Sequence, residues 1–299
     1  MTTIASIRQL AKNYGFIQAL KGVSLDVPQG SVFGILGPNG SGKTTMLGIL
    51  TSVLHASSGE YTLFGEQPNE THRRRIGCLL ETPNFYTYLN AVDNLSIVAA
   101  IRGYGFDDID RVIDVVNLTN RKHSPFSTYS LGMKQRLAIA SALLGDPDVL
   151  ILDEPTNGLD PVGIAEIRSL INQLAQKGKT VIMASHLLDE VEKVCTHVAI
   201  LKAGELITSG PVQAILHQDT LLEIATENID ELETVLRTYP GLLHIVRLEN
   251  TIEVRLSDNV QTGSVINRFC FERGIILTHL RVKKSSLEDQ FLKLTVSTK

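Results

Sequence analysis

The chain has 299 residues, of which 43% are hydrophobic and 20% are charged, and its formal net charge is -4. This composition is typical of a globular protein and excludes a disordered or fibrous chain. The small negative charge provides no basic face for nucleic acid, so no nucleic-acid partner is expected. The length predicts one large domain and a smaller one.

Three cysteines, Cys78, Cys195 and Cys270, lie far apart in the sequence and form no CxxC pair. They suit a reducing compartment and argue against a disulfide framework or a zinc site. The N-terminus lacks the apolar core of a secretory signal. No stretch reaches the ~18 apolar residues that span a bilayer. We therefore expect a chain that is soluble on its own.

The first two thirds of the chain alternate apolar strand patterns with helical patterns. Strands are expected over residues 19–27, 32–36, 149–152, 180–184 and 197–201. Helices are expected over residues 44–53, 90–102, 109–117, 132–144, 163–176 and 188–195. The stretch from about 85 to 145 is mainly helical. Alternating strands and helices predict an α/β fold with a parallel sheet covered on both faces.

The pattern changes towards the C-terminus, where a second set of elements is expected. They are strand 221–225, helix 229–238, strands 244–248 and 251–256 around a turn at Glu249 and Asn250, helix 263–273, strand 275–282 and a closing helix 286–294. The β-α-β-β-α-β order is typical of a ferredoxin-like α+β unit. We therefore expect two domains, residues 1–218 and 219–299.

A glycine-rich turn between the strand at 32–36 and the following helix matches the phosphate-binding P-loop. The matching residues are Gly37, Pro38, Asn39, Gly40, Ser41, Gly42, Lys43 and Thr44, with Thr45 beside them. Glycines let consecutive backbone amides surround phosphates, and the helix N-terminus adds its positive dipole end. Lys43 would reach the β- and γ-phosphates, and Thr44 would offer a hydroxyl to Mg²⁺. Chance matches to this pattern come to about 0.01 per chain of this length, so the motif predicts a site for phosphates and Mg²⁺.

The second half of the predicted site follows the apolar strand at 149–152. Asp153 ends this strand, as expected of a Walker B carboxylate that helps to hold Mg²⁺. Glu154 comes next and can polarise the attacking water as a general base. Adjacent acids at a strand end are usually a solvated turn, but an upstream P-loop makes the catalytic interpretation the better one.

Further motifs in the same order resemble the ABC ATPase family over roughly residues 4–215. The segment from Tyr129 to Leu137 resembles the family signature, and the stretch from Asp153 to Asp160 resembles Walker B running into the D-loop. Ser185 and His186 resemble the switch-histidine position. The resemblance implies a P-loop NTPase parallel-sheet core with antiparallel β and helical subdomains.

The resemblance also assigns roles to individual residues. It implies that Ser130 and the helix amides after it, from Gly132 onward, bind the γ-phosphate held by an opposite subunit. It implies that His186 contacts the γ-phosphate, that Asp160 belongs to the D-loop beside the nucleotide, and that Tyr14 stacks on adenine. For Tyr14 a packed surface position is the alternative.

Two positions depart from the family pattern. Most relatives carry Gln where this chain has Glu81, which can still meet Mg²⁺ but adds negative charge near the phosphate. Leu131 replaces the first of two signature glycines. Both departures resemble those of the drug- and antibiotic-export subfamily.

The resemblance implies ATP with Mg²⁺ as the cofactor, and it implies protein partners as well. A second ATP-binding subunit, identical or different, would complete each site, and a separate membrane-spanning permease would receive the motion. The chain would then be cytoplasmic and peripheral on the inner face of the cell membrane. The segment 83–88 offers aromatic residues for docking, although a buried local cluster is an equal alternative. The basic run Arg73, Arg74 and Arg75 is either a solvated surface or a contact with anionic lipid or a partner.

Two other functions are weighed against a transporter subunit. An ABC ATPase acting on nucleic acid or ribosomes would carry two cassettes or a long coiled coil, and this chain has one P-loop and no heptad run. A non-transport ATP switch that anchors proteins to a membrane is the third hypothesis. Cargo and the role of the C-terminal domain are left open.

Overall fold

The computed structural model describes residues 2–80, 84–216, 220–256, 263–283, 287–288 and 291. The chain forms two compact units, Met1–Gly210 and Pro211–Lys299. This division lies slightly before the boundary that the sequence predicts between residues 218 and 219.

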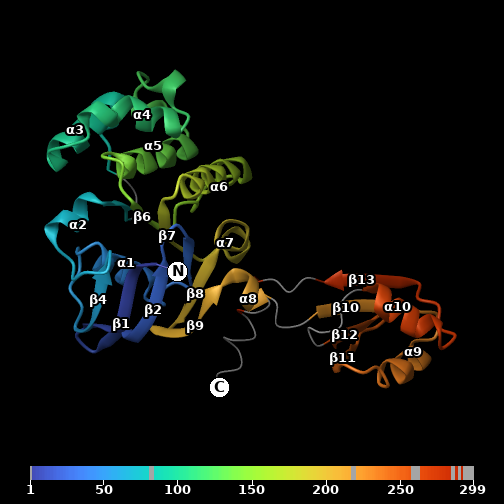
Figure 1. Ribbon diagram of the computed structural model, residues 1–299. Helices are drawn as coiled ribbons and strands as arrows, with labels where there is room; N and C mark the ends of the chain where they lie inside the picture. The colour runs from blue at the N-terminus through green and yellow to red at the C-terminus, as the bar shows by residue number, and fades with distance from the viewer. Residues whose placement is uncertain are drawn as a thin grey trace. The chain divides into compact units, whose positions relative to one another are not determined.

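A six-stranded sheet forms the core of the first unit (Figure 1). Its strands, in spatial order, are β5 (Ile76–Leu79), β6 (Val149–Asp153), β7 (Thr180–Ser185), β3 (Val32–Leu36), β8 (His197–Lys202) and β9 (Glu205–Pro211). Neighbours from β5 to β8 run parallel. Every residue of β3, β6 and β7 is buried, which explains why these strands are apolar on both faces.

A three-stranded antiparallel sheet lies beside this core. It consists of β2 (Ile17–Pro28), β1 (Thr3–Tyr14) and β4 (Ser58–Leu63) in that order. Its inward side chains, such as Ile7 and Leu20, join those of β3 and α1 (Lys43–Leu50) in one hydrophobic cluster. The antiparallel sheet is therefore packed onto the P-loop helix.

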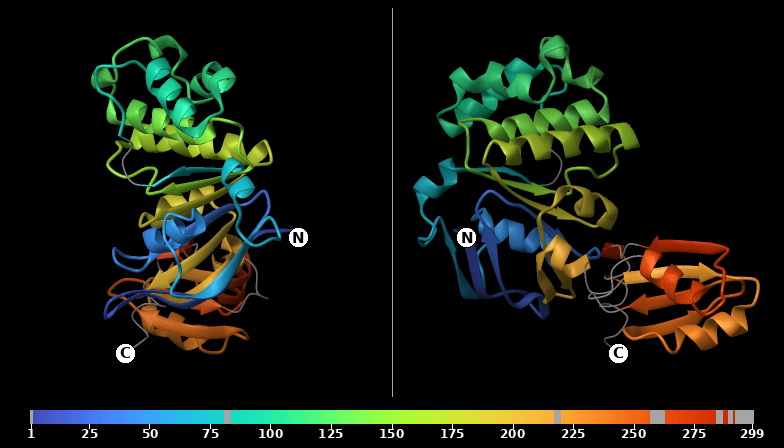
Figure 2. Two further views of the ribbon diagram at one scale, coloured as in Figure 1. Left: turned by 90° about the vertical axis from the view of Figure 1, so that its left-hand side faces the viewer. Right: turned by 45° about the vertical axis from the view of Figure 1, so that its right-hand side comes forward.

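Helices make up the rest of the first unit (Figures 1 and 2). They are α2 (Glu70–Arg74), α3 (Ala91–Arg102), α4 (Ile109–Val115), α5 (Leu131–Leu143), α6 (Pro161–Gln176) and α7 (Leu188–Val194), with short 3₁₀ turns at Phe106–Asp108, Thr119–Arg121 and Phe126–Thr128. Helices α3, α4 and α5 contact one another and form the predicted helical region. Asn90 caps α3 by accepting a hydrogen bond from the Asp93 amide, and Gly103 ends this helix in a left-handed conformation.

The second unit confirms the predicted element order. It contains α8 (Val212–Leu216), β10 (Thr220–Ala225), α9 (Ile229–Leu236), β11 (Leu242–Arg247), β12 (Ile252–Leu256), α10 (Gly263–Phe271) and β13 (His279–Lys283). The strands lie in the order β11-β12-β10-β13, and all neighbours are antiparallel. This is the ferredoxin-like arrangement, with α9 and α10 packed in one core with the sheet.

The last predicted strand is shorter than the apolar pattern indicates. It was expected over 275–282, but β13 begins at His279. Gly274 has a left-handed φ of 82°, and the Ile275 amide donates to Cys270 at the end of α10. Ile275 is apolar because it fills the core below this turn, at 4% exposure. Of the predicted closing helix, residues 287, 288 and 291 lie in the described part of the chain and are helical.

No helix in the described ranges is both long enough and apolar enough to cross a membrane.

Candidate nucleotide site

The P-loop connects β3 to α1, and its glycines are required by close packing. Gly42 has φ 103°, and a Cβ there would lie 2.5 Å from the Ala19 carbonyl oxygen. A Cβ on Gly37 would lie 2.4 Å from the Leu201 carbonyl oxygen. Larger side chains would therefore push the loop away from β2 and β8.

Lys43, the first residue of α1, is buried in the P-loop. Its side chain is 6% exposed, and Nζ donates to the carbonyl oxygens of Gly37 at 2.8 Å and Pro38 at 3.3 Å. Nζ also lies 3.8 Å from Glu154 Oε1. A buried ammonium needs such compensation, and phosphate oxygens arriving in the loop would supply a stronger form of it.

Glu154 and His186 meet because the strands that precede them are neighbours. Asp153 at the end of β6 pairs with Ala184 in β7, and the Glu154 amide donates to the Ala184 carbonyl at 3.0 Å. His186 Nδ1 lies 2.9 Å from Glu154 Oε2. Glu154 itself has φ 46°, a left-handed backbone that is uncommon outside glycine and that concentrates at functional sites.

A pocket of about 620 Å³ opens over the P-loop. Predicted site residues on its wall are Asn39, Gly40, Gly42, Lys43, Thr44, Thr45 and Glu154. The opposite wall comes from residues that the sequence analysis did not identify, namely Ile17, Gln18, Ala19, Lys21 and Ala203. These residues belong to β2 and the β8–β9 turn and carry no motif, so only the fold brings them to the site.

Tyr14 lies beside this pocket but is absent from the described residues that form its wall. It ends β1, is 46% exposed, and its ring lies 5.1 Å from the Lys12 ammonium. Its partner across the hairpin, Ile17, lines the pocket instead.

Ser130, Gly132 and Asp160 also lie outside the pocket wall of their own chain. Ser130 is the N-cap of α5, where its Oγ accepts a hydrogen bond from the Met133 amide at 3.3 Å. Asp160 is the N-cap of α6, and its Oδ1 accepts from the Gly163 amide at 2.8 Å. The free backbone amides at the N-termini of α5 and α6 therefore lie outside the wall of the nucleotide pocket of the same chain.

The residues expected to bind Mg²⁺ are Thr44, Asp153 and Glu81. Thr44 lines the pocket and Asp153 is 7% exposed, whereas Glu81 lies outside the described residues. Within the described ranges no three His, Cys, Asp or Glu side chains gather as a metal cage. One hydroxyl and one carboxylate suit Mg²⁺, which keeps several waters and takes substrate phosphates as its other ligands. The residues present therefore fit this ion.

A buried hydroxyl in the P-loop independently indicates a polar ligand. The hydroxyl of Ser41, inside the P-loop, is buried and has no hydrogen-bond partner in the described part of the chain. Buried polar atoms normally have partners, so this hydroxyl is available to a ligand.

Comparison with known proteins agrees with this geometry. Residues 20–157 match the family model described as ABC transporter. The bacitracin transport ATP-binding protein of Bacillus licheniformis is 36% identical over 300 residues, which cover 98% of both chains.

Two solved structures show the same fold. An ATP-binding cassette, MJ0796, solved as a dimer in a post-hydrolysis state with ADP and Pi, has a TM-score of 0.62 and 27% identity, covering 70% of this chain and 98% of that one. The cbiO1 protein of Clostridium perfringens, part of the ABC transporter complex cbiONQ, has a TM-score of 0.66 and 29% identity, covering 79% of this chain and 94% of that one.

The pocket, its ordered motifs and a relative that matches along nearly the whole chain agree, and this protein belongs to the ABC transporter ATP-binding proteins, a family of nucleotide-binding ATPases.

Proposed function

We propose that this chain hydrolyses Mg²⁺–ATP at the interface of two ATP-binding subunits and so powers an exporter whose membrane-spanning permease is a separate protein. The observation that carries the proposal is the contact series from Lys43 to Glu154 to His186 beside the P-loop pocket. Similarity to a bacitracin transport protein supports export, and an antibiotic-like peptide is the cargo class that this similarity favours.

Each residue of the contact series has a chemical role in this proposal. Lys43 neutralises charge on the β- and γ-phosphates. Outside the series, Thr44 and Asp153 would hold Mg²⁺, which would neutralise further phosphate charge. Glu154 polarises the water that attacks the γ-phosphate, and the short contact with His186 holds its carboxylate in place. Glu81 remains a candidate third contact to the metal.

Two subunits are needed because the signature segment lies away from the pocket of its own chain. Ser130 and the α5 amides would bind the γ-phosphate held by the partner, which is an anion at a helix N-terminus. The dimeric cassette with ADP and Pi supports this arrangement. The partner is a second copy or a related subunit.

The permease would dock on the surface between the core and helical regions. Tyr86 and Tyr88 are 51% and 73% exposed, with ring centroids 5.8 Å apart, whereas Phe85 packs against Phe126 at 5.3 Å. A groove of about 740 Å³ lies between α2, β5 and the end of α3, with Cys78 and Arg102 in its wall. Docking of the permease on this surface would hold the chain at the cytoplasmic face of the membrane.

The catalytic role is tested by Glu154→Gln. Loss of the carboxylate should leave ATP binding intact and lower steady-state hydrolysis by about 10²-fold or more, because the general base is gone. Glu60→Gln, at an exposed position in β4, is the matched control and should leave hydrolysis unchanged. Retained turnover in Glu154→Gln, measured as phosphate release, would remove Glu154 from this role.

Docking is tested by Tyr86→Ser and Tyr88→Ser together. These changes should reduce co-purification with the permease while leaving basal ATP hydrolysis unchanged. Phe106→Ser, at another exposed aromatic with 52% exposure, serves as the control. Undiminished capture of the permease by the double variant would place the docking surface elsewhere. ATP hydrolysis that no co-purifying membrane-spanning protein stimulates would instead favour the non-transport ATP switch.

A further inference from the structure

The turn between α5 and β6 joins the signature helix to the Walker B strand. Gly145 and Asp146 in this turn both have left-handed backbones, with φ values of 80° and 54°. A Cβ on Gly145 would lie 2.6 Å from the Tyr104 ring, so the turn is closely packed as well as sharply bent. Charged side chains from the helical region and from the core of the first unit meet at this turn.

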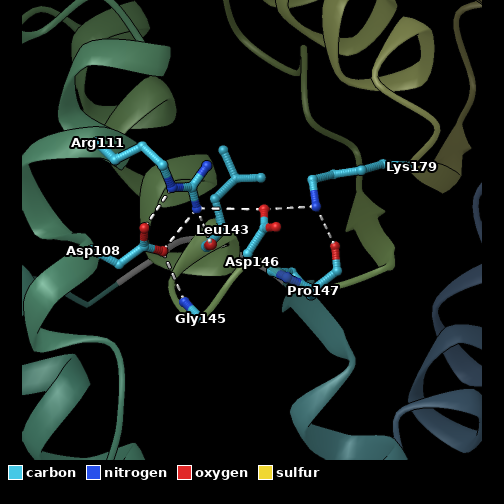
Figure 3. A network of polar contacts seen from close by, with 7 residues as sticks. All are labelled: Asp108, Arg111, Leu143, Gly145, Asp146, Pro147 and Lys179. Atoms are coloured by element: carbon cyan, nitrogen blue, oxygen red, sulfur yellow. Dashed lines mark hydrogen bonds and ion pairs between the residues drawn. The ribbon is translucent and has the colours of Figure 1, made fainter.

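Two side chains from the helical region hold the end of α5 (Figure 3). Arg111 in α4 binds both carboxylate oxygens of Asp108, and its Nη2 also donates to the Leu143 carbonyl at 3.3 Å. The Gly145 amide donates to Asp108 Oδ2 at 3.0 Å. Hydrogen bonds from Arg111 and from the Gly145 amide hold the pKa of Asp108 below its usual value, so the pair remains ionised at neutral pH.

One side chain from the core holds the same turn from the opposite side. Lys179, just before β7, is 12% exposed, and its Nζ lies 2.8 Å from Asp146 Oδ1 and donates to the Pro147 carbonyl at 2.7 Å. Arg111 Nη2 lies 3.5 Å from the same Asp146 oxygen. Asp146 therefore stands between a cation of the helical region and a cation of the core sheet, as Figure 3 shows.

We propose that Asp108, Arg111, Asp146 and Lys179 form a pivot latch that sets the direction of α5, and hence where Ser130 meets the phosphate of the partner subunit. This inference rests on the two-subunit site proposed above. The latch residues lie outside the wall of the nucleotide pocket, so the role that we assign to them is positional.

A small change in the angle of α5 at the pivot latch would displace the signature end of this helix by a larger distance. Helix α5 spans Leu131–Leu143, and at 1.5 Å per residue it is about 20 Å long. A tilt of about 5° at the latched end therefore moves the Ser130 end by roughly 2 Å. A misplacement of that size is enough to weaken a phosphate contact strongly.

Removal of one latch charge should leave the helix folded. Asp146 is 67% exposed, and exposed ion pairs contribute little to the free energy of unfolding. The Arg102 guanidinium independently donates to the Ser141 carbonyl at 2.9 Å, and the Ala142 carbonyl packs closely against Gly77 of β5. These contacts hold α5 against the sheet while the latch restrains its direction.

The first test compares Asp146→Asn with Lys177→Gln. Asparagine keeps the left-handed backbone preference and the side-chain shape but removes the charge. Lys177 is an exposed lysine near Lys179 and serves as the control. Each change is placed in full-length Glu154→Gln protein with Mg²⁺–ATP, and dimerisation is measured by sedimentation. We expect Asp146→Asn to raise the dimer dissociation constant about 5-fold or more, with ATP binding to the single subunit within 2-fold of the parent.

The second test measures the direction of α5 in one chain without a partner. Spin labels at Leu131→Cys and Glu60→Cys, with Cys78→Ser, report the distance from the signature to the core by pulsed electron paramagnetic resonance. Leu131 is 52% exposed and Glu60 is exposed, whereas Cys195 and Cys270 are buried. Asp146→Asn should broaden or shift this distance distribution, and Lys177→Gln should not.

The two tests separate the inference from the proposed function. An unchanged distance distribution, or a changed one with undiminished dimerisation, would overturn the latch. Failure of the Glu154→Gln parent to dimerise would overturn the two-subunit site, and the latch inference with it. Weaker dimerisation together with a changed distribution supports the latch.

Discussion

At the scale of single residues, Gly40 and Gly42 allow the cost of a left-handed backbone to be separated from the cost of steric overlap. Both have positive φ, 103° and 80°, but a Cβ on Gly42 meets the Ala19 carbonyl whereas a Cβ on Gly40 meets nothing within 4 Å. Gly40→Ala should therefore cost about 1 kcal/mol of the free energy of unfolding, which is the conformational term alone.

Gly42→Ala adds overpacking to that conformational term, so we expect it to cost about 1–3 kcal/mol more than Gly40→Ala. Urea unfolding of both nucleotide-free variants measures the difference. Equal losses in the two variants would show that the P-loop does not need its close approach to β2.

At the scale of elements, the N-caps of α5 and α3 allow helix capping by Ser130 to be separated from the ligand role proposed for it. Ser130 caps α5, and Asn90 caps α3 in the same way. Ser130→Ala and Asn90→Ala should each cost about 1 kcal/mol of the free energy of unfolding, since each removes one cap.

Only Ser130→Ala should also weaken ATP-driven dimerisation and lower hydrolysis, because Ser130 alone would face the partner's phosphate. Thermal unfolding and phosphate release, measured on both variants, check this. A fall in hydrolysis of the same size in Asn90→Ala would reduce the Ser130 effect to helix capping.

At the scale of the whole molecule, the two units have separate hydrophobic cores. Leu232 of α9 is fully buried in the core of the second unit, and the nucleotide pocket is built from residues of the first. Leu232→Ala should destabilise the second unit by about 2–5 kcal/mol, through a cavity, while ATP affinity stays unchanged. Calorimetry and ATP titration of the variant measure both quantities. A loss of ATP affinity would show that the second unit supports the nucleotide site.

Burial within the whole molecule explains which elements could be predicted from the sequence. Strands such as β3, β6 and β7 were identified because burial on both faces requires continuous apolar runs. The strand expected from residue 275 was extended too far, since Ile275 is apolar for packing below a turn and not for pairing. An apolar residue reports burial, and burial alone does not distinguish a strand from a packed turn.

For the site, residues in local motifs could be proposed from the sequence, whereas the part of the pocket wall that comes from distant segments could not. The P-loop residues were identified because their backbone conformation and helix N-terminus depend on neighbours in sequence. Ile17 and Ala203 carry no motif, and they reach the pocket through packing of β2 and of the β8–β9 turn. The stacking role expected of Tyr14 stays a prediction, since Ile17 occupies the wall beside it.

The sequence by itself determined the chemical groups, namely a phosphate-binding loop, two acids after a buried strand and a histidine after the next one. Only the tertiary structure decided that Glu154 meets both Lys43 and His186, because this depends on the strand order β6-β7-β3. It also decided that Asp146 lies between Arg111 and Lys179. Local motifs follow from interactions between neighbouring residues, whereas strand order follows from long-range pairing that no short pattern encodes.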